Sequence, residues 1–234
     1  MSTIEFNALD KIYKDVSAVS NFTAKVEAGR ITGFIGPNGA GKSTTLRCLL
    51  GLAEPTRGEA LIEGKRYSEL EHPLHKVGSV LDSSGFNGAL TANQNLKVIC
   101  AAAGINPLVI PKLLKLVELD HAANKRTKGF SLGMRQRLSL AAALLGDPDI
   151  LVLDEPANGL DPIGIVWLRD FLRELANQGK TILVSSHQLA EMQHTIDDVI
   201  IINRGTLIAQ GNAQEIMAGQ SLEEAFMRLI GVTK

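Results

Sequence analysis

Short apolar runs recur along the chain, and most are bounded by glycine, proline or aspartate. Residues 150–153 form an unbroken apolar run, which is typical of a central parallel strand covered on both faces. Residues 31–35, 77–81 and 181–185 are strand-like as well, and helical patterns separate these runs. Strands that alternate with helices predict an α/β fold with a mainly parallel sheet.

A different pattern predicts antiparallel structure. Polar and apolar residues alternate at 3–6 and at 20–26, which predicts two short strands around a turn, with Tyr13 on the loop between them. Residues 59–64 form another alternating strand, and the apolar runs 199–202 and 206–209 flank a turn typical of a hairpin.

A helical pattern interrupts the strands in the middle of the chain. From residue 91 to about 119 apolar residues recur at helical spacing, which predicts a helical insert of roughly 50 residues that ends in the helix after Ser131. Ser221 and Glu224 form a capping box that opens a last amphipathic helix. We therefore expect one domain over residues 1–234: a core at about 1–84 and 141–220, a helical part at about 85–140, and a C-terminal helix at about 221–234.

Composition narrows the class of protein. Hydrophobic residues make up 45% and aromatic residues 4%, so the core is expected to be aliphatic. The net charge of −1, without a basic block, argues against a nucleic-acid-binding surface. Cys48 and Cys100 have no metal-binding or redox spacing and are expected to be buried. The Met1 end lacks the layout of a signal peptide, and no uncharged apolar run approaches the ~18–20 residues of a membrane helix, so we expect a soluble chain.

The most specific motif lies between the strand at 31–35 and a helix. The stretch Gly36-Pro37-Asn38-Gly39-Ala40-Gly41-Lys42-Ser43-Thr44 fits the phosphate-binding loop G-x-x-x-x-G-K-[ST]. Glycines allow several backbone N–H groups to point at one anion, and the following helix adds its positive end. Lys42 would reach the β- and γ-phosphates, and the Ser43 hydroxyl would ligate Mg²⁺.

Further polar residues follow two other predicted strands. Asp154 and Glu155 come directly after the run 150–153, and His187 follows the strand at 181–185. Because ligands bind beyond the carboxyl ends of parallel strands, we expect these residues to converge with Lys42. Asp154 would help to hold Mg²⁺, and Glu155 would orient the attacking water and accept its proton. His187 could donate to the γ-phosphate, although a histidine after a strand is more often structural.

The motifs together resemble the ATPase subunit of an ATP-binding cassette (ABC) transporter. The resemblance rests on the phosphate loop, on Phe130-Ser131-Leu132-Gly133-Met134-Arg135-Gln136, on residues 151–156, on Gly159-Leu160-Asp161-Pro162 and on Ser186-His187. Their order and separations match the family over about residues 4–230. The resemblance implies a RecA-like P-loop NTPase core with an antiparallel β subdomain and a helical subdomain that faces a membrane partner.

The resemblance also implies roles for individual residues. Ser131 and Gly133 stand in the family's signature segment, which closes over the ATP held by a second subunit, although Ser131 could equally be a plain helix N-cap. Tyr13 stands where the family has an adenine-stacking aromatic, although an exposed loop tyrosine is more often surface. Glu155 resembles the catalytic base and His187 the switch histidine. Asp161 resembles the loop that crosses the dimer interface, and it also suits a helix N-cap.

Two departures from the family pattern stand out. Met134 and Arg135 replace the second glycine and the glutamine of the signature, a variant associated with exporters of drugs, lipids and antimicrobial peptides. Asp82 stands where the family has a glutamine that contacts Mg²⁺. Aspartate can ligate Mg²⁺ through oxygen, but it is shorter and charged.

The resemblance implies ATP and Mg²⁺ as cofactors, a separate transmembrane permease, and a second ATP-binding subunit, identical or closely related. It places the chain at the cytoplasmic face of a bacterial membrane, with export as the expected direction and no nucleic-acid partner. One alternative is an ABC ATPase that acts on ribosomes or DNA. Another is a small-molecule P-loop kinase, which would give Ser131 and Gly133 no role.

Overall fold

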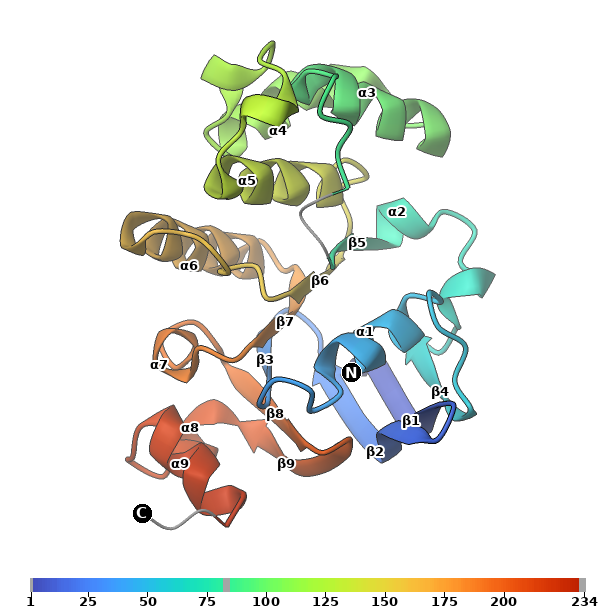
Figure 1. Ribbon diagram of the computed structural model, residues 1–234, viewed down its shortest axis with the longest axis vertical. Coiled ribbons are helices and arrows are strands. Elements are labelled where there is room, and N and C mark those ends of the chain that lie inside the picture. Colours follow the sequence, from blue (N-terminus) through green and yellow to red (C-terminus); the bar gives the residue numbers. More distant parts are fainter. Residues whose placement is uncertain (1, 82–84, 232–234) are drawn as a thin grey trace.

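A six-stranded sheet forms the centre of the computed structural model, which describes residues 2–81 and 85–231 (Figure 1). The strand order is β5-β6-β7-β3-β8-β9, and all neighbours are parallel except β8 and β9. The expected α/β fold with a mainly parallel sheet is confirmed. The bounds are β3 Ile31–Ile35, β5 Val77–Val80, β6 Ile150–Asp154, β7 Thr181–Ser186, β8 Asp198–Asn203 and β9 Thr206–Asn212.

The central sheet divides the core into two halves. Along β6, Leu151 and Leu153 pack with the helices on one face, whereas Ile150 and Val152 pack with α1 (Lys42–Leu49) and a second sheet on the other. All four side chains are fully buried. The unbroken apolar run is therefore explained by cover on both faces, as expected of a central parallel strand.

The second sheet is antiparallel, with the order β2-β1-β4. Its strands are β1 Ser2–Tyr13, β2 Val16–Glu27 and β4 Arg57–Ile62. The prediction of two short strands around a loop at 11–15 was wrong in extent, because the hairpin continues to a turn at 14–15. Shifts in register and positive φ angles at Ala8 and Asn21 interrupt the alternation of side chains, so the pattern hides the middle of both strands.

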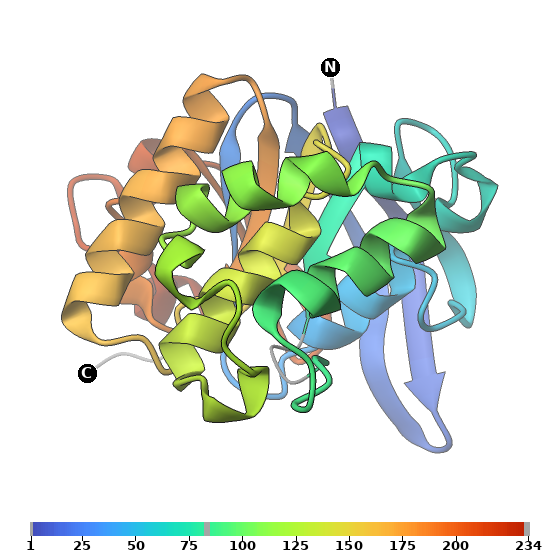
Figure 2. The same ribbon diagram turned by 90° about the horizontal axis from the view of Figure 1, so that it is seen from above.

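Three helices lie together at one end of the molecule, beyond the β5 edge of the sheet (Figure 1). They are α3 Ala92–Ala103, α4 Ile110–Leu116 and α5 Leu132–Ala143, and Figure 2 shows them across the face of the molecule with α6 beside them. Arg137 of α5 stacks on Trp167 of α6 (Pro162–Asn177), with the guanidinium carbon 3.8 Å from the ring centroid. This stack joins the helical segment to the helix that covers the central sheet.

The remaining α-helices of the described residues are short. They are α1 Lys42–Leu49, α2 Pro73–Lys76, α7 Leu189–Met192, α8 Ala213–Met217 and α9 Leu222–Leu229. Ser221 and Glu224 form the predicted capping box of α9, which packs beside α7 and α8. α7 ends at Met192, before the chain turns into β8.

Both cysteines are buried, as predicted. Burial raises the pKa of the Cys48 and Cys100 thiols, which disfavours the reactive thiolate. Among the described residues, none of the helices combines the length and the apolar character needed to span a membrane.

Candidate functional site

The phosphate loop joins the carboxyl end of β3 to α1, as the motif predicts. Two of its glycines are required by their surroundings. A Cβ on Gly36 would lie 2.3 Å from the carbonyl oxygen of Ile202, and one on Gly41 would lie 2.5 Å from that of Ala18. Gly41 also has a φ of +107°, which disfavours any other residue. Substitution at either position would therefore push the loop away from the strands that support it.

Hydrogen bonds from neighbouring residues fix the backbone of the loop. Gly205, in the turn between β8 and β9, donates its N–H to Ala40 O at 2.9 Å. The Thr45 hydroxyl donates to Gly41 O at 3.0 Å. Because Gly41 is the N-cap of α1, no side chain caps the helix, and its first N–H groups are available to a ligand.

A hollow of about 300 Å³ lies directly beside the loop. Lys42 enters it almost completely buried, with Nζ donating to Gly36 O at 2.6 Å. Glu155 lies across from it, with Oε1 3.4 Å from Lys42 Nζ. The lining comprises loop residues Pro37 to Thr44 together with Ala18, Glu155, Asn158 and His187.

Glu155 connects the two sides of this hollow. Its Oε2 accepts from His187 Nδ1 at 2.7 Å, while its Oε1 faces Lys42. These residues come from the ends of the adjacent strands β6 and β7 and from the loop after β3, next to β7. The order of strands therefore brings Lys42, Glu155 and His187 together, as expected from their positions after strands. Asp154 lies at the end of β6 and accepts a hydrogen bond from Ser185.

Two other predicted site residues cap helices. The Ser131 hydroxyl accepts from Met134 N at 3.2 Å at the start of α5, and Asp161 accepts from Gly164 N at 2.8 Å at the start of α6. Neither of them, nor Gly133, lines the hollow beside the phosphate loop. The chain segments that carry these two caps are in contact. Leu132, next to Ser131, packs so closely on Gly159 that a Cβ added to this glycine would lie 1.9 Å from Leu132 Cδ2.

Tyr13 does not line this hollow. Tyr13 ends β1 with 44% of its surface exposed, and the Lys11 ammonium lies 4.8 Å from its ring centroid. Asp82 lies outside the described residues. The sequence reasoning missed Asn158 and Ala18. Asn158 lies between Glu155 and Asp161, within the motif region, so its position in the sequence could have indicated that it lines the site. No feature of the sequence indicates this for Ala18.

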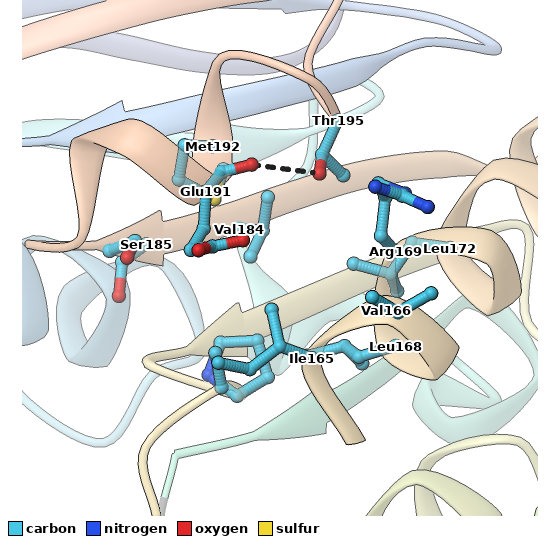
Figure 3. Close-up of a pocket in the computed structure, with 13 residues that line it drawn as sticks. Ile165, Val166, Leu168, Arg169, Leu172, Val184, Ser185, Glu191, Met192 and Thr195 are labelled. Atoms are coloured by element: carbon cyan, nitrogen blue, oxygen red, sulfur yellow. Dashed lines mark hydrogen bonds between the residues drawn. The ribbon is translucent and has the colours of Figure 1, made fainter. Parts of the chain in front are cut away.

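A second hollow, between α6 and the β7–α7 segment, does not suit a nucleotide (Figure 3). Its volume is about 30 Å³, and its lining is mainly apolar, including Ile165, Leu168 and Val184. In Figure 3 Ser185 lies at the opposite end of this hollow from Arg169 and Thr195. Only the hollow beside the phosphate loop combines glycines, a buried lysine and a carboxylate among the hollows described here.

A phosphate loop at the carboxyl edge of a parallel sheet, faced by a carboxylate from a nearby strand, defines a P-loop nucleotide triphosphatase. The chain belongs to the ABC transporter family, whose sequence model matches residues 19–158. It is an ATP-binding subunit of an ABC transporter and, as a member of this ATPase family, it hydrolyses ATP. The sequence-based prediction of family and activity is confirmed.

Similar proteins support this assignment over most of the chain. The bacitracin transport ATP-binding protein BcrA of Bacillus licheniformis is 42% identical over 214 residues, which are 90% of this chain and 70% of the relative. The lantibiotic transport ATP-binding protein SrtF of Streptococcus pyogenes is 37% identical over 223 residues, 95% of either chain. The solved structure of an ATP-binding subunit of an ABC transporter has a TM-score of 0.87 and 29% identity, and the match covers 98% of this chain and 100% of that one.

Proposed function

We propose that this chain binds MgATP beside its phosphate loop and hydrolyses it in a sandwich of two ATP-binding subunits, which drives a separate membrane permease. The observation that carries the proposal is the convergence of Lys42, Glu155 and His187 on one hollow, with Ser131 and Gly133 outside it. One chain thus supplies phosphate-binding and water-orienting groups. The signature residues would come from a second subunit.

Each residue at the hollow has a chemical task in this proposal. Lys42 and the N–H groups of the loop bind the β- and γ-phosphates. Glu155 orients the attacking water and accepts its proton, because its carboxylate already faces the phosphate-binding lysine at 3.4 Å. His187 turns from Glu155 to donate to the γ-phosphate. Tyr13 would stack on adenine, since its hairpin also carries Ala18 to the hollow.

Mg²⁺ fits the donors at this edge of the sheet. Ser43 and Asp154 offer oxygen ligands, and Mg²⁺ commonly takes its other ligands from phosphate and water. No group of three or more His, Cys, Asp or Glu suited to a metal ion occurs within residues 2–81 and 85–231, so a metal held by protein alone is not favoured. Bound Mg²⁺ would neutralise charge that develops on the phosphates. Asp82 stays a predicted additional contact.

The helical segment is proposed to face the permease. Residues of about 85–140 form this subdomain, those of about 1–84 and 141–220 form the ATPase core, and those of about 221–234 contain the last helix. Arg137 and Trp167 join the first two parts. The chain would then sit at the cytoplasmic face of a bacterial membrane, in line with its bacterial relatives.

The proposed cargo is a peptide antibiotic, and the proposed direction is export. The printed names of two relatives refer to bacitracin and lantibiotic transport, and that of a third, from Burkholderia orbicola, to Nod factor export. The signature variant at Met134 and Arg135, which resembles that of exporters, also supports export as the direction of transport. In a sensitive bacterial host, the chain with its permease should raise tolerance to bacitracin or a lantibiotic, and the Glu155→Gln version should not. Unchanged tolerance to both compounds would reject this cargo class.

A test of the transporter assignment is to extract native membranes gently in detergent, capture the tagged chain, and identify its partners by mass spectrometry. We expect a multi-span membrane protein in near-stoichiometric amount, absent from a mock-tagged strain. Capture of ribosomes or DNA without a membrane protein would instead favour an ABC ATPase that does not transport.

A further inference from the structure

The hydroxyl of Ser185 lies between the two carboxylate residues at the end of β6. Ser185 is completely buried and follows the apolar residues Ile182, Leu183 and Val184 in β7. A buried hydroxyl requires hydrogen-bond partners, because burial removes it from water. The presence of serine here, in a strand that is otherwise apolar at its centre, therefore calls for a chemical reason.

Both of its partners belong to the proposed hydrolytic machinery. The Ser185 hydroxyl donates to Asp154 Oδ1 and accepts from the backbone N–H of Glu155 at 3.0 Å. The directions are fixed, because a backbone N–H can only donate and an ionised carboxylate can only accept. The contact is set by register, since Asp154 and Ser185 pair across β6 and β7.

The backbone of Glu155 has an unfavourable conformation, and the hydrogen bond from Glu155 N–H to the Ser185 hydroxyl helps to hold it. Glu155 has a φ of +51°, a conformation that is unfavourable for a residue with a side chain. Its N–H is held at this point by the Ser185 hydroxyl and by Ser185 O at 3.2 Å. The turned backbone carries the carboxylate of Glu155 to Lys42 and His187.

Asp154 is oriented by the same hydroxyl. Its Oδ1 is engaged by Ser185, while its Oδ2 makes no hydrogen bond to any described residue. One oxygen is thus fixed to the strand, and the other is left to a cation or its water. A hydrogen bond of this kind orients a metal-ligating carboxylate in many metal sites.

We propose that Ser185 is a positioning residue for ATP hydrolysis, which orients Asp154 toward Mg²⁺ and fixes the backbone that presents Glu155. This inference rests on the roles proposed above for Asp154 and Glu155. Ser185 itself is not among the residues that line the hollow beside the phosphate loop. It acts on two neighbouring residues with different tasks through one hydroxyl group.

The test compares Ser185→Ala with the wild-type full chain in two measurements. The first is the affinity for a fluorescent ATP analogue in EDTA and in Mg²⁺. In EDTA, we expect the affinity for the ATP analogue to change less than about twofold. The Mg²⁺ concentration that gives half of the Mg²⁺-dependent gain in this affinity should rise about tenfold, a typical loss when a residue that orients a metal ligand is removed. The second is steady-state hydrolysis, in which kcat should fall about tenfold or more with little change in KM.

Thr181→Val is the matched control. Thr181 begins the same strand, is buried, and accepts a hydrogen bond from Gly29 N at 3.0 Å, but it lies at the opposite end from the site. Loss of the Thr181 hydroxyl should lower the stability of the protein without changing the Mg²⁺ dependence of nucleotide binding. Ser185→Thr retains the hydroxyl and should restore most of kcat.

The outcomes separate this inference from the proposed function. Wild-type Mg²⁺ dependence and kcat in Ser185→Ala would overturn the role of Ser185 while leaving the ATPase assignment intact. A wild-type chain that neither binds nor hydrolyses ATP would instead reject the proposed function. If Ser185→Ala does not fold, the same measurements are made on Ser185→Cys, whose thiol is only a weak hydrogen-bond donor. Full ATPase activity of Ser185→Cys would overturn the inference.

Discussion

His187 Nδ1 lies 2.7 Å from Glu155 Oε2, so a histidine from the end of β7 and a carboxylate from the end of β6 form one hydrogen-bonded unit. The other carboxylate oxygen faces Lys42. Glu155 therefore lines the hollow beside the phosphate loop and contacts two of the residues proposed to bind the γ-phosphate. Substitution of Lys42 or of His187 therefore tests the proposed roles of this cluster.

Lys42→Ala should weaken nucleotide binding. The buried ammonium is the cation of the phosphate loop, and a hydrogen bond to a charged group contributes about 1.5–3 kcal/mol, which corresponds to roughly a 10- to 100-fold loss of affinity. Titration with a fluorescent ATP analogue measures this loss. Lys65→Ala, at an exposed position, is the control and should bind normally. Equal affinity of the two variants would contradict the phosphate-loop assignment.

His187→Gln should slow hydrolysis more than it weakens binding. The ring contacts Glu155 rather than the loop that holds the phosphates, so we expect kcat to fall about 100-fold or more while affinity changes little. Steady-state kinetics and equilibrium binding on the same preparation separate the two effects. His121→Gln provides an exposed histidine for comparison. A normal kcat in His187→Gln would show that this histidine is structural.

Asp161→Ala should destabilise the protein through the start of α6. The carboxylate accepts from Gly164 N at 2.8 Å, and the loss of such an N-cap costs about 1 kcal/mol. Thermal denaturation should show a decrease of about 2–4 °C in Tm. Asp161→Asn retains a capping oxygen and should stay close to wild type in Tm. If the asparagine variant is as unstable as the alanine variant, the charge and not the cap is responsible.

Ser131→Ala should separate a capping role from a role in a second subunit's site. Both Ser131 and Ser221 cap a helix, so alanine at either position should cost about 1 kcal/mol. Ser131 lies outside the hollow of its own chain, so nucleotide affinity should be unchanged in both variants. Hydrolysis should fall only in Ser131→Ala. Equal ATPase activity in the two variants would leave Ser131 as a cap alone.

Local motifs explain why much of the site could be predicted from the sequence. The phosphate loop needs its glycines, lysine and hydroxyl within nine residues, and the steric limits at Gly36 and Gly41 account for that pattern. The position of Glu155 after an apolar run likewise marked the carboxyl end of a strand. Their convergence followed from one general property of parallel sheets.

Features that depend on strand register or on contacts between distant parts of the chain could not be predicted from the sequence. The long hairpin was missed because positive φ angles at Ala8 and Asn21 break the alternation that marks a strand. Ser185 looked like any small residue near a strand end until its pairing with Asp154 was known. The approach of Ala18 to Gly41 also requires the three-dimensional arrangement of two sheets.

The most direct test of the central claim is the molar mass of Glu155→Gln, measured by light scattering during size-exclusion chromatography with and without MgATP. Glutamine keeps the size of the side chain but cannot accept the proton of the attacking water, so the ATP sandwich should persist. We predict a monomer without nucleotide and a doubled mass with saturating MgATP, and a double variant with Ser131→Ala should dimerise less. A mass that stays monomeric at saturating MgATP would contradict the account.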